Sequence, residues 1–352
     1  MATYSGHVIK LSVFGASREP SVGVSIEGIP AGERIDLSDL QLFLDRRAPG
    51  RFAWTTARKE PDVPQFLSGL CDGVTTGEPI TAVLQNTDAA KSETRTVLRP
   101  GHADWPAYMK YGEIPAGGGK FSGRLTAPFC VAGGICLQLL KKRGIEIAAH
   151  ALTVADECDT PFDPMQPDLK ALNGKEFPTL DQAAGERMIA KILNAKAEEN
   201  SHGGIIECAV TGLPAGLGDH LWEGLESRIA QLVFGIPGVK GVQFGNGFAA
   251  ASLKGSENND PLCIENGTIT ATSNRSGGIL GGMATGLPLL FTAAVKPTPT
   301  VGVAQQTVDV STFTETEASF AGRNDPCIVP RAVPVIEAAG ANALYDAISE
   351  NA

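Results

Sequence analysis

A histidine in a turn is the residue of this sequence best suited to moving protons. His102 lies in the segment RPGHAD (99–104), with a guanidinium three residues before it and a carboxylate two residues after it. Imidazole titrates near neutral pH, and a neighbouring charge tunes it for general acid or base work. A histidine that only caps a turn fits the same residues equally well, so this segment alone leaves both interpretations open.

A glycine-rich stretch with cations follows shortly after. Residues 117–124 read GGGKFSGR and precede a long apolar run. Glycines let a ligand approach the backbone, and a helix N-terminus beside Lys120 and Arg124 favours an anion. The stretch is not a P-loop, because that motif needs Gly where Ile114 stands and Ser or Thr where Phe121 stands. A flexible turn with an ordinary helix cap is the alternative.

Further segments also carry residues suited to chemistry. Residues 277–282 (GGILGG) and 296–300 (KPTPT) combine glycines, hydroxyls and a lysine that suit a phosphate, although glycine-rich strand connections are the commoner explanation. The adjacent Arg and Asp of 322–327 (GRNDPC) form either a salt-bridged loop or an active-site pair. Residues 245–250 (GNGFAA) superficially fit a dinucleotide fingerprint, but a polar run begins at Lys254, too soon for the required helix. We interpret that segment as a turn.

Composition excludes several classes of partner. The 352 residues include 29 Lys+Arg and 39 Asp+Glu, a formal net charge of −10, which argues against nucleic acid as the main partner. No run reaches the roughly 18 apolar residues of a transmembrane helix, and no signal peptide is visible, so we expect a cytoplasmic protein without a membrane partner. The seven cysteines are widely spaced without a CxxC pair, which predicts buried free thiols and no metal site.

The apolar pattern predicts the elements that must position these residues. Strands are expected over 7–15 and 22–28, and a helix is expected after the N-cap residue Asp36. Residues 123–143 are apolar almost all round, which predicts a buried central helix that ends at a basic cluster and Gly144. Further helices are predicted at about 180–198, 219–234 and 333–350.

An internal repeat links the two ends of this pattern. Ser17-Arg18 precedes GIPAG (28–32) by the same spacing with which Ser201-His202 precedes GLPAG (212–216). Each copy leads from a predicted strand through the GxPAG segment into a helix with an acidic start. Repeats of this kind indicate two similar structural units that pack together. The pattern therefore predicts an α+β fold with two related halves about a long central helix.

Taken together and in this order, the segments resemble the chorismate synthase family. The matching stretches cover nearly the whole chain: LDRRAPG (44–50), TTARKEPD (55–62), RPGHAD (99–104), GGGKFSGR (117–124), SHGGIIECAVTGLPAGLG (201–218), VKGVQFGNGFAAASLKGSENND (239–260), GGILGGMATG (277–286), KPTPT (296–300) and GRNDPCIVPRAVPV (322–335). The resemblance implies an α+β fold, a β-α-β sandwich forming one compact domain over 1–352. Its pseudo-repeat halves are about 1–150 and 185–352. It also implies a homotetramer.

The resemblance further implies a lyase of the shikimate pathway of aromatic amino-acid biosynthesis. Its reaction is the 1,4-anti-elimination of phosphate and a ring proton from 5-enolpyruvylshikimate 3-phosphate, which gives chorismate. Reduced FMN is implied as the cofactor although no net redox occurs, and NADPH enters only as an external reductant. A reduced flavin lends electron density as phosphate leaves, and the protein holds flavin and substrate together away from oxygen and water.

The resemblance assigns roles to residues of the matching motifs. His102 corresponds to a histidine beside the flavin, and Asp325 to an aspartate linked to proton removal. Arg18 and the family's substrate arginines are expected around phosphate and carboxylates, where a guanidinium fork suits the anion. The implied flavin contacts are Lys120, Phe121, Ser122, Gly281, Lys296, Pro297, Thr298, Pro299, Thr300 and Arg323, and the implied substrate contacts are Arg18, Arg47, Arg99 and Arg124.

The sequence departs from the family pattern at its first motif. The family's FGESHGP is FGASREP here (14–20), so Arg18 stands where a histidine is expected to protonate the departing phosphate. Asn324 replaces the histidine of GRHDPC, whereas the second repeat copy keeps His202 where the first has Arg18. Arginine binds phosphate but is a poor general acid. The departures leave two alternatives beside the enzyme: a divergent paralogue that binds flavin or a phosphorylated anion with lost or altered elimination, and a non-catalytic scaffolding subunit.

Overall fold

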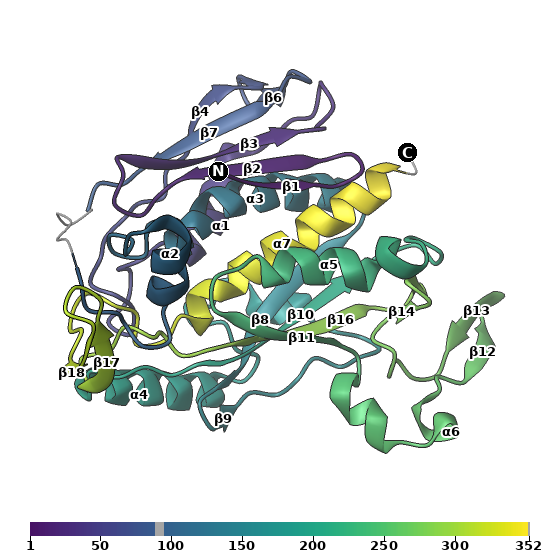
Figure 1. The fold of residues 1–352 in the computed structure, drawn as a ribbon. Helices are drawn as coiled ribbons and strands as arrows, with labels where there is room; N and C mark the ends of the chain where they lie inside the picture. The colour runs from purple at the N-terminus through teal and green to yellow at the C-terminus, as the bar shows by residue number, and fades with distance from the viewer. Residues whose placement is uncertain (89–94, 351–352) are drawn as a thin grey trace.

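Two antiparallel sheets enclose a layer of helices in this protein (Figure 1). The structure, a computed structural model, describes residues 1–88 and 95–350. The first sheet has the order β1-β2-β3-β7-β4 and the second the order β11-β16-β10-β8-β9. Their strands are, in the first sheet, Ala2–Ser5, Lys10–Gly15, Ser21–Glu27, Ile80–Gln85 and Gln65–Ser68, and in the second Val239–Phe244, Leu289–Val295, Gly204–Thr211, Glu146–Val154 and Glu157–Cys158.

Short two-stranded hairpins lie outside the two large sheets. They are β5–β6 (Leu70–Cys71, Val74–Thr75), β12–β13 (Leu262–Glu265, Thr268–Ala271), β14–β15 (Ile279–Leu280, Met283–Ala284) and β17–β18 (Gln305–Asp309, Thr314–Ala318). The β17–β18 hairpin lies at one end of the molecule (Figure 1), where an isolated bridge joins its Asp309 to Val97, in the segment before helix α2 (Asp104–Tyr111). The segment 245–250 leads into a 3₁₀ helix, Gly247–Ser252, and then the short helix α6 (Gly255–Asn258). No long helix follows the glycines, as the sequence indicated.

The helical layer is formed by α1 (Leu37–Arg47), α3 (Thr126–Lys142), α5 (Leu225–Phe234) and α7 (Val329–Glu350). Helix α3 packs along α7 and touches the first sheet, and α7 touches the second. Gly133 allows this close approach, because a Cβ there would lie 2.2 Å from the Cβ of Ala338. Helix α4 (Gln182–Ala197) lies on the outer face of the second sheet (Figure 1).

Local sequence signals predict the start of α1 correctly and the start of α3 to within three residues. Asp36 accepts hydrogen bonds from the amides of Ser38 and Asp39, so it is the N-cap of α1 as predicted. The predicted central helix begins three residues late, at Thr126, after a 3₁₀ turn over Gly123–Leu125. By length and composition, Gly123–Lys142 is apolar enough to cross a membrane, but most of it is buried between the sheets, which is the position of a core helix.

Other boundaries differ from expectation for identifiable reasons. The strand predicted from residue 7 begins at Lys10, because the amides of His7, Val8 and Ile9 bond the buried Asp346 carboxylate of α7 instead. The helix predicted from 219 begins at Leu225, after a 3₁₀ turn over Leu221–Glu223. The last helix, predicted over about 333–350, begins earlier, at Val329, and continues through Pro334.

The two GxPAG segments form matching turns. Gly28 and Gly212 have φ values of +91° and +82°, and a Cβ at either would strike a backbone carbonyl, that of Val8 or that of Gly144. Both turns follow the central strand of a five-stranded sheet, β3 or β10, and precede a helix of the middle layer. We propose on this basis that the chain is one unit of two related halves. Strand β8 of the second sheet begins at Glu146, before the expected start of the second half at about residue 185.

The seven cysteines are all free thiols, as the spacing predicted. Burial is not uniform among them, because Cys71 and Cys158 are exposed and Cys263 is half-buried. The others, Cys130, Cys136, Cys208 and Cys327, belong to the core.

Candidate functional site

A cavity of about 920 Å³ opens where the two halves meet. Its walls come from the loop after β2, the end of α1, the loop before α2, the turns before α3, the end of α5, and the segments on either side of β17–β18. The residues assigned by motif line it, with the exception of Gly281: His102, Asp325, Lys120, Phe121, Ser122, Lys296, Pro297, Thr298, Pro299, Thr300, Arg323, Arg18, Arg47, Arg99 and Arg124. Gly281 lies in the β14–β15 turn, outside the lining.

The lining carries far more positive than negative charge. Its carboxylates are Asp88 and Asp325, and each is ion-paired with an arginine. The cations are Arg18, Arg47, Arg58, Arg95, Arg99, Lys120, Arg124, Lys240, Lys296, Arg323 and Arg331. Burial lowers the pKa of Arg18, and the like charges of Arg58, Arg323 and Arg99 lower it further. Several guanidinium groups therefore face one space, which favours a ligand with several negative charges.

His102 is held in a defined orientation by a charged pair beneath it. Arg99 donates from Nε and Nη2 to the Asp104 carboxylate, at 2.8 and 2.6 Å, and from Nη2 to the Gly117 carbonyl at 2.6 Å. His102 Nδ1 lies 2.8 Å from Asp104 Oδ1. Because both Nη2 hydrogens of Arg99 are used, the network assigns the Nδ1 proton to the bond with Asp104. The Nε2 atom of a neutral His102 is then an acceptor.

Asp104 remains ionised in this arrangement. It is fully buried, which by itself would raise the pKa of its carboxyl. The hydrogen bonds from Arg99 and His102 outweigh burial and hold that pKa well below its usual range. A negative charge behind His102 fixes the orientation of its ring.

A buried cluster of two arginines and one aspartate forms a second wall. Arg47 Nε lies 2.8 Å from Asp62, and Arg124 Nη1 bonds the other oxygen of the same carboxylate. Arg124 also donates to Asn86 at 2.7 Å and to the Gln85 carbonyl at 3.1 Å. Burial lowers the pKa of Arg47 to about 10, although Asp62 opposes the shift. One carboxylate thus balances two buried guanidiniums and leaves an excess positive charge facing the cavity.

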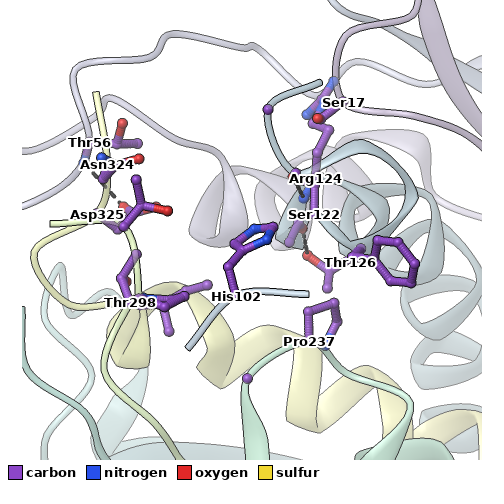
Figure 2. A pocket seen from close by; sticks show the side chains of 18 of the residues that line it. Ser17, Thr56, His102, Ser122, Arg124, Thr126, Pro237, Thr298, Asn324 and Asp325 are labelled. Carbon is purple, nitrogen blue, oxygen red and sulfur yellow. Dashed lines mark hydrogen bonds between the residues drawn. The ribbon is translucent and has the colours of Figure 1, made fainter. Parts of the chain in front are cut away.

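Asp325 is held in place by two neighbouring residues. Arg331 pairs with its Oδ2, the amide of Thr56 donates to Oδ1 at 3.1 Å, and Arg331 Nε also bonds the Arg47 carbonyl at 3.0 Å. In Figure 2, Asp325, Asn324 and Thr56 lie together on one side of the view, and Ser122 and Arg124 lie on the other side. His102 lies between the two groups. The carboxylate is 14% exposed, enough to reach a ligand in the cavity.

The glycine-rich turn and the KPTPT segment complete the lining. Ser122 Oγ accepts from the amide of Arg124 at 3.1 Å, and the Lys120 ammonium lies 3.3 Å from the centre of the Tyr111 ring. Lys296 donates to the Gly101 carbonyl at 2.5 Å, which joins KPTPT to the loop of His102. Burial lowers the pKa of Lys296, and the nearby Lys240 adds to the effect.

The residues present fit an anionic, polar cofactor or substrate. Within the described part of the chain, Ser17 Oγ, Arg47 Nη2 and Thr298 Oγ1 are buried without a hydrogen-bond partner, and all three residues line the cavity. Buried polar groups ordinarily find partners, so these donors indicate a ligand that supplies acceptors. The excess of cations around them specifies phosphate or carboxylate as the ligand group.

Several lining residues escaped the sequence analysis as site residues. Arg58 lies in the quoted motif TTARKEPD and bonds Glu60 at 2.7 Å and the Ser17 carbonyl at 3.3 Å. Arg331 lies in the quoted stretch GRNDPCIVPRAVPV but was assigned no role. The wall from the end of α5, residues 234–238, carries no motif that marks it as a site. His202 was weighed against Arg18 as its repeat partner, but its amide bonds the Pro326 carbonyl at 2.8 Å, and its side chain does not line the cavity.

Comparisons with known proteins agree on one family. The family model for chorismate synthase matches residues 9–349. Similar proteins include the chorismate synthase of Lancefieldella parvula, 43% identical over 99% of this chain and 96% of the relative, and that of Korarchaeum cryptofilum, 40% identical over 97% and 96%. A solved structure titled "Crystal Structure of Chorismate Synthase" is similar with a TM-score of 0.77 and 25% identity, over 99% of this chain and 93% of that one.

Proposed function

The chain belongs to the chorismate synthase family, and from this premise we propose how its basic cavity works. As a lyase of that family, it eliminates phosphate from 5-enolpyruvylshikimate 3-phosphate to give chorismate. The observation that carries the proposal is the arrangement of His102 and Asp325 in one cavity whose lining is dominated by arginines. The identity of about 40% to relatives named chorismate synthase favours the enzyme over the divergent paralogue and over the scaffolding subunit.

We assign the anionic groups of the substrate to the arginines. Arg18, with Arg99 and Arg58 close enough to shift its pKa, suits the phosphate that leaves. Arg47 and Arg124 share Asp62 and suit a carboxylate. A guanidinium fork binds either group through paired hydrogen bonds, and burial strengthens the attraction. Neutralised phosphate is a better leaving group, so Arg18 supports the elimination even though it does not donate a proton.

We assign reduced FMN to the remaining part of the cavity. The residues that would hold it are the turn Lys120–Ser122, the segment 296–300, and Arg323, whose Nη1 atom lies 2.7 Å from Asp88. Bound FMN would lend electron density for the expulsion of phosphate and recover it as the ring proton leaves. Gly281 would contribute only from outside this cavity. NADPH is proposed only as an external source of electrons for the flavin.

The protein's own groups then handle the protons. We assign removal of the ring proton to Asp325, which is paired with Arg331 and lines the cavity. The acceptor Nε2 of His102, backed by Asp104, can receive and return a proton inside the cavity. Neither Arg18 nor Asn324 replaces the proton donor of the family motif, so the departing phosphate takes its proton from water after it has left.

We propose a homotetramer in the cytoplasm with a small-molecule substrate and no nucleic-acid or membrane partner. The support for assembly is a set of apolar side chains that protrude from β12–β13 and its surroundings. Such groups are normally covered in larger assemblies. They are Phe248, Leu262, Ile264, Ile269 and Leu280, each more than half exposed.

The test is an anaerobic assay with dithionite-reduced FMN and 5-enolpyruvylshikimate 3-phosphate. Chorismate absorbance and released phosphate are followed together. Stoichiometric appearance of both products supports the proposal. Tight binding of FMN and substrate without either product would instead identify a paralogue that has kept the site and lost the reaction.

A further inference from the structure

An ion pair between α1 and α7, with a buried carboxylate and a partly exposed guanidinium, lies next in the chain to the substrate arginine Arg47. Arg46 Nη1 and Nη2 bond the two oxygens of Glu337 at 2.6 and 2.8 Å. The Glu337 side chain is 3% exposed, whereas Arg46 is 42% exposed. Glu337 Oε1 also accepts from the amide of Ala149 at 2.9 Å, so the carboxylate joins α1, α7 and strand β8 of the second sheet. Neither residue lines the main cavity.

The chain neighbour of Arg46 belongs to the cavity. Arg46 and Arg47 are the last two residues of α1, and Arg47 faces Asp62. Helix α7 holds this last turn at two points. Arg331 Nε bonds the Arg47 carbonyl at 3.0 Å, and Glu337 bonds Arg46. Six residues of helix separate these points by about 9 Å, so the end of α1 is clamped on two sides.

The two contacts affect both Arg47 and Asp325, the residues that the proposed function uses. Arg331, which bonds the Arg47 carbonyl, also pairs with Asp325. A shift of the α1 terminus therefore moves Arg47 and disturbs the orientation of Asp325 through one shared guanidinium. Burial of Arg47 leaves it little room to compensate, since its side chain is 1% exposed and its Nη2 has no partner within the described residues.

We infer that Arg46 and Glu337 are positioning residues, which set the place of Arg47 and, through Arg331, of Asp325. They touch neither substrate nor cofactor. The inference rests on the proposed function, from which it takes the roles of Arg47 and Asp325. A displacement of about 1 Å in such groups can reduce a rate about a hundredfold, so the pair has a measurable effect on catalysis.

The experiment compares Arg46→Gln, Glu337→Gln, the double variant and Arg46→Lys with wild type. Glu337→Gln keeps an acceptor for the Ala149 amide and buries no lone charge, so it remains folded even where Arg46→Gln does not. Arg187→Gln is the matched control, because Arg187 pairs with Glu157 at 2.9 Å on the surface. The readouts are kcat, KM for the enolpyruvyl substrate, melting temperature, and the Kd of inorganic phosphate by titration calorimetry.

We expect Glu337→Gln to lower kcat/KM and to weaken phosphate binding, each at least tenfold. Arg46→Lys should retain more turnover and phosphate binding than Arg46→Gln, and the control Arg187→Gln should match wild type. Variants that lose only melting temperature would overturn the inference, because the pair would then be structural. A wild-type protein that binds no phosphate would overturn it too. If wild type lacks turnover, the proposed function fails, while the phosphate Kd values still decide the positioning role.

Discussion

The shared aspartate of the cavity wall provides the sharpest test of the electrostatic argument. Asp62 is 1% exposed and lies between Arg47 and Arg124, which are 1% and 4% exposed. Asp62→Asn keeps the shape of the side chain but removes the one negative charge that balances two buried guanidiniums. Loss of one partner of a buried ion pair destabilises a protein by about 3–5 kcal/mol. The pKa of Arg47, already lowered to about 10 by burial, would fall further without Asp62.

The expected shift in melting temperature follows from the size of the chain. An unfolding entropy of about 2.1 cal/mol/K per residue gives about 0.7 kcal/mol/K for 352 residues. A loss of 3–5 kcal/mol then lowers the melting temperature by about 4–7 °C. Differential scanning calorimetry of wild type and Asp62→Asn measures it. Asp45→Asn is the control, because its pair with Arg51 at 2.9 Å is solvent-exposed and contributes about 0–1 kcal/mol.

Added phosphate distinguishes this reasoning from simple loss of packing. An anion that binds only the folded state stabilises it, by about 2.7 kcal/mol at a hundred times its Kd. In Asp62→Asn the anion also supplies the missing negative charge, so phosphate should raise the melting temperature of the variant more than that of wild type. An unchanged melting temperature in Asp62→Asn, or an equal gain from phosphate in both proteins, would refute the argument.

Three further predictions concern single features of the molecule. Arg18→His combined with Asn324→His should raise turnover at least tenfold by restoring proton donors, and a double variant no faster than wild type in the anaerobic assay would contradict this. Gly117→Ala should weaken phosphate binding, because a Cβ there lies 2.7 Å from Arg18 Nε, whereas Gly112→Ala has a similar positive φ and open space; equal phosphate Kd values in calorimetry would be evidence against a specific clash. Burial lowers the pKa of His150, but its hydrogen bonds to two buried carboxylates raise that pKa overall. The charged form of His150 therefore stabilises the fold most below about pH 6.5, and this contribution is lost as pH rises through the folded-state pKa. The melting-temperature gap between wild type and His150→Gln should therefore narrow from pH 6 to 9, and a constant gap would exclude this linkage.

Local sequence predicted the features that depend on neighbours along the chain. Asp36 caps α1 because its carboxylate needs only the amides two and three residues later. The GxPAG turns followed from their glycines, which alone tolerate the positive φ and the nearby carbonyls. All of the residues assigned by motif except Gly281 line the cavity, because each motif carries its ligand-facing residues within a few positions.

Boundaries failed where distant partners compete with local preference. Residues 7–9 read as strand, yet their amides bond Asp346 at the far end of the chain. The last helix read as starting near residue 333, yet α7 begins at Val329 and continues through Pro334 because its surroundings are packed core. In both cases tertiary contacts outweigh the weak local propensity.

The sequence by itself determined the family, the main helices and the motif residues that line the cavity, with the exception of Gly281. Only the tertiary structure decided how those residues share charge. Asp62 serves Arg47 and Arg124, and Glu337 reaches Arg46 across nearly the whole length of the chain. Ion pairing depends on separation in space and on burial, and a linear pattern specifies neither for groups on different elements.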